Sequence, residues 1–490
     1  MVAAHAPLLS KSKLLAARQC RRRLHLELHR PELAVIGKET QAALDTGNAV
    51  GRVAQSIYGT ENSVLVAGNG GLERALRQTA LLLRAATPAP VFEAAFEYGG
   101  VLVRVDVLLP TGAGWRLVEV KASTRLEPEH VADCAIQLWV VEGAGCPLAG
   151  VSVAHVDSQF VYPGDDAYGG LLREEDVEAD ARRLLPLVPE WASDARAAAT
   201  GPEPRVAVGA QCFKPYACPF VGHCWPGDVE HPLLELPRAA KGRLGEFVAR
   251  GYRDLREVPP GELTEAQRRV QRVTRSGVAE SDPAIGRYLR SLEFPRYYLD
   301  FESVGPAIPV FPGTGPYQAL PFQWSCHYES GPGRLEHAEF LDLTAAPPFR
   351  RLAESLVRAL GRVGPIVVYS SYERTMLDRL ARLFADLGPA LAALAGRLVD
   401  LRPIIEQGYY HPSMRGSWSL KSVLPAVLPD MNYGKLDGIQ EGMDASSGYL
   451  EAIAPGTTPE RRQALDAQLR AYCRFDTEAL YRLVQVFAAR

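Results

Sequence analysis

Two acid-bearing strand patterns, about two hundred residues apart, constrain the fold more than any other feature of the chain. The first carries Asp106 and, after a short turn, Glu119 and Lys121, while the second carries Asp300 and Glu302. Hard divalent cations such as Mg²⁺ or Mn²⁺ prefer carboxylate oxygen, and two such ions stabilise both the attacking and the leaving oxygen in phosphodiester hydrolysis. The duplication therefore predicts two separate metal-dependent phosphodiester-cleaving sites in one chain.

Length and composition are those of a folded protein with more than one domain. At 490 residues the chain exceeds one ordinary core, so two or three domains are expected. No apolar run approaches the ~20 residues that span a bilayer, and no cleavage signal follows the N-terminus, so we expect a cytoplasmic protein that does not contact membranes. A net charge of -3 gives no global nucleic-acid signature. The best local basic surface is the segment 11–30, for which a solvated helix face is the alternative.

The first acid pattern predicts a β-hairpin. Residues 101–109 and 115–121 alternate as strands, and 111–114 form the turn. A period of two places Glu119 and Lys121 on one face. With Asp106 opposite them, the two acids are expected to hold a metal ion, and the lysine to position water and stabilise developing charge.

The eight cysteines fall into two groups. Four lie singly in apolar or helical surroundings and are interpreted as structural: Cys134, Cys146, Cys326 and Cys473. Three others, Cys212, Cys218 and Cys224, form a C-x5-C-x5-C pattern in a loop, which favours metal coordination because disulfides are disfavoured in the cytosol. Either Cys20 or His223 would supply the fourth ligand. Three thiolates with a histidine suit zinc, whereas four thiolates suit zinc or a 4Fe-4S cluster.

The second acid pattern begins at 296–302, a strand with two apolar faces from which Asp300 and Glu302 project on one side. A second buried strand, 364–369, precedes a helix whose first turn holds Glu373, a candidate ligand or a plain capping residue. Further along, Asp400 is expected to end another strand. In the C-terminal helix, the i, i+4 spacing sets Tyr472 and Asp476 on one face.

The N-terminal half resembles a known nuclease family. A cysteine followed by basic residues, then the D...ExK hairpin, then a Cys-Pro-Phe...Cys stretch resembles the iron-sulfur branch of the RecB-like PD-(D/E)XK nucleases, which includes the CRISPR-associated exonuclease and AddB-type subunits. The resemblance implies that Glu93 and Gln137 belong to the active site. Two positions depart from it, because Gly51 replaces a metal-binding histidine of many relatives and Val141 replaces a tyrosine. The implied ligands of a 4Fe-4S cluster are Cys20, Cys212, Cys218 and Cys224.

The C-terminal half resembles a second family. The order of its acids and of Tyr472 is similar to that of DEDD exonucleases of the tyrosine type. The segments 307–309, 316–317, 321–323, 419–421 and 472–477 resemble a bacterial domain of unknown function that is grouped with ribonuclease-H-like exonucleases. This implies that Tyr472 orients the attacking water, with Asp400 in reserve because Glu373 replaces the usual aspartate. Lys421 is a candidate phosphate contact, although an ordinary surface lysine is the alternative. The implied ligands of the two metal ions are Asp300, Glu302, Glu373 and Asp476.

Together these features predict an α/β protein in three parts. Residues 1–225 would form a RecB-like iron-sulfur nuclease domain with a restriction-endonuclease-like fold, 226–290 a helical connector, and 291–490 a DEDD-type, DnaQ-like and ribonuclease-H-like exonuclease domain. The expected activity is hydrolysis of DNA single strands or duplex ends in DNA processing or phage defence. No ATP-binding loop is present, so a helicase or a defence-system component is a plausible partner. The alternatives are a non-catalytic DNA-binding or scaffolding subunit with decayed sites, and an RNA-processing exonuclease.

Overall fold

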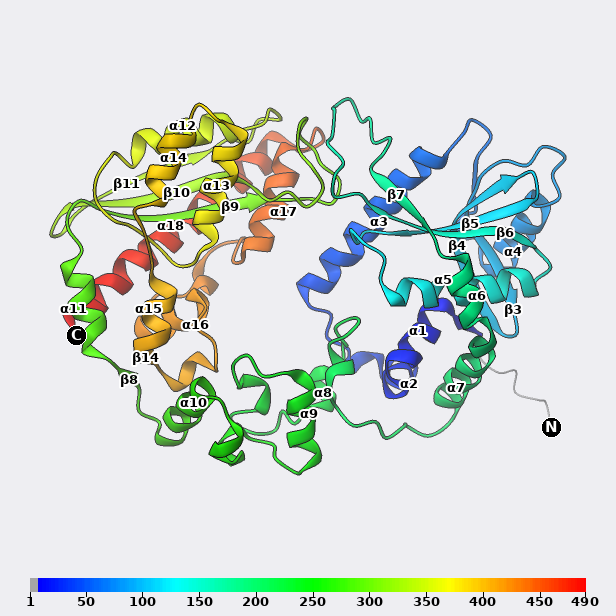
Figure 1. Ribbon diagram of the computed structural model, residues 1–490, viewed down its shortest axis with the longest axis horizontal. Coiled ribbons are helices and arrows are strands. Elements are labelled where there is room, and N and C mark those ends of the chain that lie inside the picture. The colour runs from blue at the N-terminus through cyan, green and yellow to red at the C-terminus, as the bar shows by residue number, and fades with distance from the viewer. Residues whose placement is uncertain (1–7) are drawn as a thin grey trace. The chain divides into compact units, whose positions relative to one another are not determined.

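The computed structural model describes residues 8–490, which form two compact units (Figure 1). Unit 1 contains the described residues up to Asp228 together with Ala240–Gly251 and Ala307–Tyr317. Unit 2 contains Val229–Ala239, Tyr252–Pro306 and Gln318–Arg490. The segment expected to be a connector, 226–290, is therefore shared between the units. Both units combine helices with a mixed sheet, which confirms the α/β class.

Unit 1 is built on a seven-stranded sheet in the order β2-β3-β4-β5-β6-β7, with the short β1 paired to β4. The alternating apolar residues of β3, β4 and β5 pair as an antiparallel meander, and β6 then runs parallel to β5. The strands are β1 (Leu9–Ser10), β2 (Val64–Leu65), β3 (Val91–Tyr98), β4 (Val101–Thr111), β5 (Gly114–Lys121), β6 (Leu148–Val156) and β7 (Leu172–Asp176).

Helix α5 (Pro128–Gly143) links the parallel strands β5 and β6. It begins with Pro128 in its first turn and with a cap in which Glu127 and His130 exchange side-chain and backbone hydrogen bonds. Buried residues surround it on nearly every side, as expected for a helix inside a core. The other helices of unit 1 are α1 (Lys11–Gln19), α2 (Arg21–His29), α3 (Lys38–Tyr58), α4 (Leu72–Leu82), α6 (Glu178–Leu184), α7 (Val188–Thr200), α8 (Val221–Cys224) and α9 (Lys241–Ala249).

Unit 2 is built on a five-stranded sheet in the order β11-β10-β9-β12-β13. The first three strands are antiparallel, and β9, β12 and β13 are parallel to one another. These strands are β9 (Arg296–Val304), β10 (Leu320–Gly331), β11 (Arg334–Leu341), β12 (Ile366–Val368) and β13 (Leu398–Asp400). A separate two-stranded ladder pairs β8 (Glu280–Ser281) with β14 (Tyr409–Tyr410).

The longest helix of unit 2, α18 (Pro459–Ala489), packs against β9 and β10. Its buried stripe recurs at helical spacing through Leu465, Leu469, Cys473 and Leu480, which fixes the face turned to the sheet. The remaining helices are α10 (Glu265–Ser276), α11 (Pro283–Ser291), α12 (Phe349–Ala359), α13 (Tyr372–Leu383), α14 (Gly388–Ala395), α15 (Leu401–Gly408), α16 (Leu420–Val427) and α17 (Gly442–Ile453).

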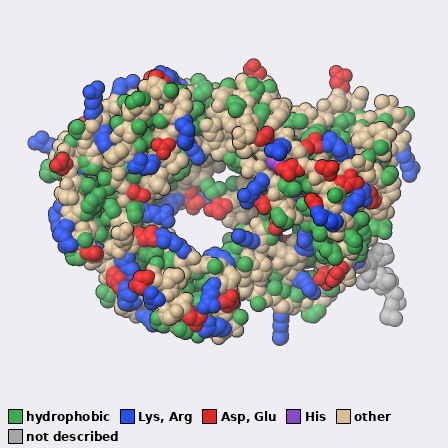
Figure 2. Space-filling model, in the orientation of Figure 1, with side chains coloured by type: hydrophobic (Ala, Val, Ile, Leu, Met, Phe, Trp, Pro, Cys, Tyr) green, Lys and Arg blue, Asp and Glu red, His purple; other side chains and the backbone are tan. Residues whose placement is uncertain are grey.

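Acidic and basic side chains are interspersed over the face shown in Figure 2, in keeping with a net charge of -3. Among the described helices, none combines the length and the hydropathy that crossing a bilayer requires.

Candidate active sites and cysteine cluster

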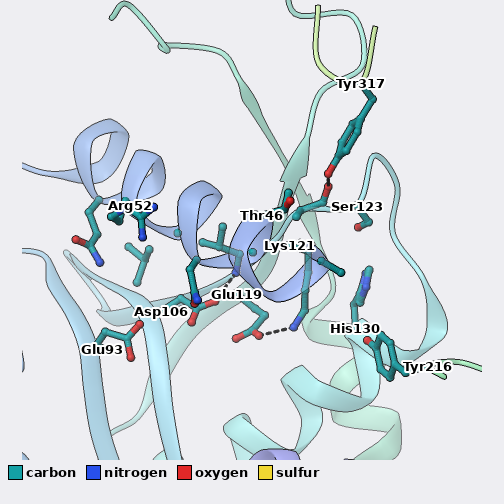
Figure 3. A pocket seen from close by; sticks show the side chains of 18 residues that line it. Thr46, Arg52, Glu93, Asp106, Glu119, Lys121, Ser123, His130, Tyr216 and Tyr317 are labelled. Atoms are coloured by element: carbon teal, nitrogen blue, oxygen red, sulfur yellow. Dashed lines mark hydrogen bonds and ion pairs between the residues drawn. The ribbon is translucent and has the colours of Figure 1, made fainter. Parts of the chain in front are cut away.

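The central strands of unit 1 bring Glu93, Asp106 and Glu119 together. The register of β4 with β5 pairs Val107 with Val118, so Asp106 lies opposite Glu119, and the Val120 backbone N–H donates to Asp106 Oδ2 (2.8 Å). On the other side of β4, Glu93 lies opposite Asp106, with its backbone in the left-handed region at φ +56°. Such strain in a non-glycine residue is typical of functional positions. All three acids line a pocket of about 840 Å³ (Figure 3).

Two buried carboxylates and two partly buried lysines form a charge cluster that reaches this pocket through Glu119 and Lys121. Lys121 Nζ lies 2.6 Å from Glu119 Oε1 and 2.7 Å from Asp133 Oδ2. Lys11 Nζ approaches the same two side chains, at 2.8 Å from Glu119 Oε1 and 2.9 Å from Asp133 Oδ1. Glu119 is only 2% exposed, so these are ion pairs shielded from water. Its charge is therefore compensated by lysines from both α1 and β5.

Gln137 completes the cluster from α5. Its Nε2 donates to Glu119 Oε2 (2.5 Å) and to Asp133 Oδ1 (3.0 Å), while its own Oε1 is buried without a hydrogen-bond donor. Asp133 and Lys11 were not among the predicted site residues. The signal for Asp133 was its position four residues before Gln137 on one helical face. In the sequence, Lys11 belongs only to the basic N-terminal segment, 11–30.

The charges of this cluster shift its pKa values in opposite directions. Burial and the charge of Glu119 raise the pKa of Asp106 to about 7, against the opposing effect of the two lysines. Burial alone would also raise the pKa of Asp133, but Lys11 and Lys121 outweigh it and hold that pKa well below its usual range. Asp133 therefore serves as a permanent anion that fixes both ammonium groups.

The two departures from the family pattern occupy different surroundings. Gly51 lies on α3 and lines the pocket, and a Cβ built at this position meets no atom within 4 Å. Val141 is fully buried in the core of unit 1. A side chain at position 51 would thus face the acids, whereas position 141 contributes only to packing.

The four predicted cluster cysteines line one small cavity in unit 1. Cys20 lies between α1 and α2, and Cys212, Cys218 and Cys224 reach the same cavity from the later loop. His223, the alternative fourth ligand, is exposed and is not part of that lining. Gln19 Nε2 donates to the backbone oxygens of Gln211 (2.7 Å) and Tyr216 (2.6 Å), which ties the N-terminal helices to the cysteine loop.

The thiols of this cavity oppose one another's ionisation. Burial raises the pKa of Cys224 to about 11, and the nearby thiolates of Cys218, Cys20 and Cys212 add to the rise while Arg22 opposes it. Burial also raises the pKa of Cys218, although a backbone hydrogen bond from Phe220 favours its thiolate. A bound cation reverses this balance because metal ligands must be deprotonated.

The basic N-terminal segment is largely neutralised. Lys13 lies 2.8 Å from Glu27, Arg23 lies 2.9 Å from the same carboxylate, and Arg22 lies 2.6 Å from Glu203. Together with the burial of Lys11 in the acid cluster, these pairs leave the segment less positive than its sequence suggests.

In unit 2, Asp300, Glu302 and Cys473 form a possible metal-binding triad whose ligand atoms lie within 4.8 Å of one another. Strand β9 supplies the two acids and α18 supplies the cysteine. Cys473 Sγ lies 3.6 Å from Asp300 Oδ2, and burial together with the nearby carboxylates raises the pKa of the thiol well above its usual range. Cys473 therefore remains a protonated donor to Asp300. The sequence alone predicts only a structural role for Cys473.

Glu373 and Asp476 extend the acid cluster of unit 2. Glu373 is 3% exposed in the first turn of α13 and accepts a hydrogen bond from Ser370 Oγ (3.3 Å). Burial raises the pKa of Glu373 to about 7 and that of Asp476 to about 6. Burial and repulsion from Asp476 also raise the pKa values of Asp300 and Glu302 well above their usual range. Three buried carboxylates and the partly buried Asp300 thus lie within electrostatic reach of one another.

Three polar residues surround this cluster. Hydroxyl groups of Tyr433 and Tyr472 hydrogen-bond to Asp476 and lower its pKa. The ammonium of Lys421 lies over the rings of Tyr433 (5.3 Å) and Tyr472 (5.9 Å), donates to the Gln440 backbone oxygen (2.8 Å), and lowers the pKa values of Glu302 and Asp476. Tyr433 was not predicted, because nothing in its local sequence relates it to the distant Asp476.

Asp400, the reserve ligand, ends β13 and caps α15. Its side chain accepts a hydrogen bond from the Arg402 backbone N–H (2.9 Å). Its charge contributes to the raised pKa of Glu373, so it lies near the margin of the acid cluster.

Comparison with known proteins adds little to this geometry. Residues 297–419 match the model of a family described as a domain of unknown function, DUF2779. That segment includes Asp300, Glu302, Glu373 and Asp400 but ends before Tyr472. Among solved structures, one titled "Crystal structure of SSO0001" aligns with 46% of this chain and 88% of its own, at 14% identity and a TM-score of 0.27. No curated protein matches the chain.

Proposed function

We propose that the chain is a Mg²⁺- or Mn²⁺-dependent nuclease that hydrolyses phosphodiester bonds of DNA. Unit 1 would hold a RecB-like PD-(D/E)XK site and unit 2 a DEDD-type, ribonuclease-H-like site. One observation carries the proposal: in each unit, carboxylates converge in one place, from adjacent strands in unit 1 and from distant segments in unit 2, at a cost that a divalent cation would offset. The mixed sheets that present these acids support the two fold assignments.

The donor set of the first site fits a hard cation. Asp106 and Glu119 supply carboxylate oxygens, and the carbonyl oxygen of Gln137 is buried nearby without a donor. A bound Mg²⁺ or Mn²⁺ would lower the pKa of a water molecule and neutralise phosphate charge. Lys121, held by Glu119 and Asp133, would orient that water and donate to a phosphate oxygen. Glu93, which accepts a hydrogen bond from Arg104 Nε (3.1 Å), would add a third carboxylate beside the ion, on the other side of Asp106.

The donor set of the second site also fits. Asp300, Glu302, Glu373 and Asp476 would hold the ions, and the hydroxyl of Tyr472, beside Asp476, would orient the attacking water. Lys421 would approach the phosphate from the exposed side. The cysteine cavity would hold a 4Fe-4S cluster, with zinc as the alternative, because four thiols line it and a backbone N–H already favours one thiolate.

Cleavage assays on the full chain test the two sites separately. Labelled single- and double-stranded DNA and RNA would be incubated with Mn²⁺ and with wild type, Asp106→Asn, Asp300→Asn or the double variant. Each single change is expected to lower cleavage at its own site by about a hundredfold or more, and the double variant to be inactive. Asp180→Asn, at an exposed ion pair with Arg183, is the control. Visible absorbance of anaerobically purified protein distinguishes an iron-sulfur cluster from zinc.

A non-catalytic, DNA-binding unit 1 is the second candidate. The ion pairs that Lys11 and Lys121 make with Glu119 and Asp133 already compensate two carboxylates of the first site, and Gly51 removes a ligand, which favours this reading. It predicts that Asp106→Asn leaves all cleavage intact while Asp300→Asn abolishes it. A wild type that is inert on every substrate with Mn²⁺ would contradict the nuclease proposal for both units. Preferential cleavage of RNA would instead support a role in RNA processing.

A further inference from the structure

The pocket of unit 1 presents two exposed tyrosines beside its acids. Tyr216 is 51% exposed and Tyr317 is 42% exposed, and both line the pocket that contains Asp106 and Lys121. In Figure 3 both rings lie on the Lys121 side of the pocket, away from Glu93 and Arg52. Large aromatic rings left in water beside a cationic side chain suit a ligand with a flat, aromatic face.

Tyr317 is held firmly in this place. Its backbone adopts the left-handed conformation at φ +55°, and its hydroxyl donates to the backbone oxygen of Ala122, the residue after Lys121. The rest of its segment, 307–317, is fastened to unit 1 by the Tyr168 hydroxyl on Pro309 O (3.3 Å) and by backbone hydrogen bonds between Tyr162 and residues Gly313 and Thr314 (2.8 and 2.9 Å). The ring is thus fixed at the end of β5, one residue beyond Lys121.

Tyr216 is placed by the cysteine loop. It lies between Cys212 and Cys218, and its backbone oxygen accepts a hydrogen bond from Gln19 Nε2 (2.6 Å). Burial of its hydroxyl raises its pKa, and the charges of Lys121, Asp133 and Glu119 also act on it, so the hydroxyl end lies near the acid cluster while half of the side chain stays exposed. A strained turn therefore positions the ring of Tyr317 at the pocket, and the cysteine loop positions the ring of Tyr216 there.

We propose that Tyr216 and Tyr317 are base-stacking residues that make the first site select unpaired nucleic-acid strands. The inference rests on the proposed nuclease function of unit 1 and adds its substrate form. An unpaired base offers its face to a tyrosine ring, whereas a duplex keeps its bases stacked on one another, so the rings stabilise only the single strand. Lys121 and Arg52, which line the same pocket, would meet the backbone phosphates.

Equilibrium binding tests this without relying on turnover. The full chain, with Ca²⁺ in place of Mg²⁺, would be titrated against a fluorescein-labelled DNA single strand and the same strand in a duplex. Tyr216→Ala and Tyr317→Ala should each weaken single-strand binding roughly fivefold or more, with less than about a twofold effect on the duplex. Tyr216→Phe keeps the ring and should retain wild-type affinity. A strand carrying 2-aminopurine should lose fluorescence on binding wild type, and less on binding either alanine variant.

Tyr288→Ala, at a tyrosine of similar exposure (44%) on α11 of unit 2, is the matched control. Visible absorbance and the unfolding midpoint of each variant show that the cysteine loop and the fold are intact. Unchanged single-strand affinity in both alanine variants, or an equal loss on the duplex, would overturn the inference. Its failure is distinct from failure of the nuclease proposal, which appears as wild-type inactivity in the cleavage assay.

Discussion

The two candidate sites handle their buried negative charge in opposite ways. In unit 1, Glu119 and Asp133 form direct ion pairs with Lys11 and Lys121, at 2.6 to 2.9 Å. In unit 2, four acids face one another, two tyrosine hydroxyls and a thiol, and the ammonium of Lys421 bonds to a backbone oxygen instead of a carboxylate. Lysines thus compensate two carboxylates of the first site directly, whereas three of the four acids of the second site accept hydrogen bonds from a thiol or a hydroxyl. The same residue chemistry therefore implies different responses to substitution, acid and metal.

The largest expected effect on stability follows from removing Asp133, the buried anion of the first site. Asp133→Ala removes one partner from a cluster that is nearly shielded from water and leaves two ammonium groups sharing Glu119. The free energy of unfolding of unit 1 should fall by about 3 kcal/mol or more. Urea denaturation, monitored by fluorescence, measures this free energy. Asp180→Ala, at an exposed ion pair, should change stability by less than about 1 kcal/mol, and an equal effect of both would show that the cluster is not stabilising.

Protonation of His327 should destabilise unit 2 in acid, while protonation of the acid cluster, whose pKa values are raised, acts in the opposite direction. This ring is 4% exposed, its Nδ1 lies 2.9 Å from Thr477 Oγ1, and burial with the charges of His337 and Arg474 lowers its pKa to about 4. Because the folded pKa lies below the unfolded value of about 6.5, the stability is complete above that value and is lost as pH falls towards 4. The loss should reach about 2 to 3 kcal/mol.

The measurement is the urea midpoint of metal-free protein between about pH 7 and about pH 4.5. Relative to wild type, His327→Gln should be more stable at about pH 4.5 than at about pH 7, whereas substitution of the exposed His29 should give no such difference. If His327→Gln keeps the wild-type pH dependence of the urea midpoint, groups other than His327 cause that dependence.

In unit 2, neutralising an acid should raise the free energy of unfolding, whereas loss of Asp133 lowers it in unit 1. Asp300→Asn keeps the shape and the acceptor for Cys473 but removes a carboxylate whose pKa is raised by burial and by Asp476, Glu302 and Glu373. We expect it to stabilise the metal-free protein by about 1 to 2 kcal/mol and to reduce the stabilisation that added Mn²⁺ produces. Thermal melts with and without Mn²⁺ measure both. The exposed Asp378→Asn on α13 is the control, and a destabilised Asp300→Asn would remove the contrast between the sites.

The smallest expected effect concerns Gly51. Because the position faces the pocket with open space, Gly51→His should tighten Mn²⁺ binding at the first site roughly tenfold, or about 1.4 kcal/mol. Gly51→Ala, without a ligand, should only stabilise α3, by about 0.5 to 1 kcal/mol. Calorimetric Mn²⁺ titration in an Asp300→Asn background isolates the first site. Equal affinity in the two variants would show that position 51 does not reach the ion.

Local pattern was enough to predict the elements that carry the acids. The hairpin expected at 101–121 forms β4 and β5, the strand at 296–302 forms β9, and the helix near Tyr372 begins there as α13. These predictions succeed because alternation and helical spacing are properties of neighbouring residues. The convergence of Asp106 with Glu119 followed as well, since a hairpin fixes its own register.

Partners supplied by distant segments could not be predicted in this way. Lys11 reaches Glu119 across 108 positions, and Tyr433 reaches Asp476 across 43. Cys473 resembled a core cysteine because its neighbours on α18 are core residues, and only the packing of α18 on β9 brings it to Asp300. Such pairings depend on tertiary arrangement, which leaves no periodic signal in the sequence.

Helix α1 links two chemically different centres. Its first residue, Lys11, is held by the carboxylates of the first site, and the residue that caps its end, Cys20, faces the cysteine cavity. Nine helical residues at 1.5 Å each separate them by about 14 Å of stiff backbone. Oxidative loss of the proposed 4Fe-4S cluster would free the C-terminal end of α1, and Lys11 at the other end would then be held less firmly against Glu119 and Asp133.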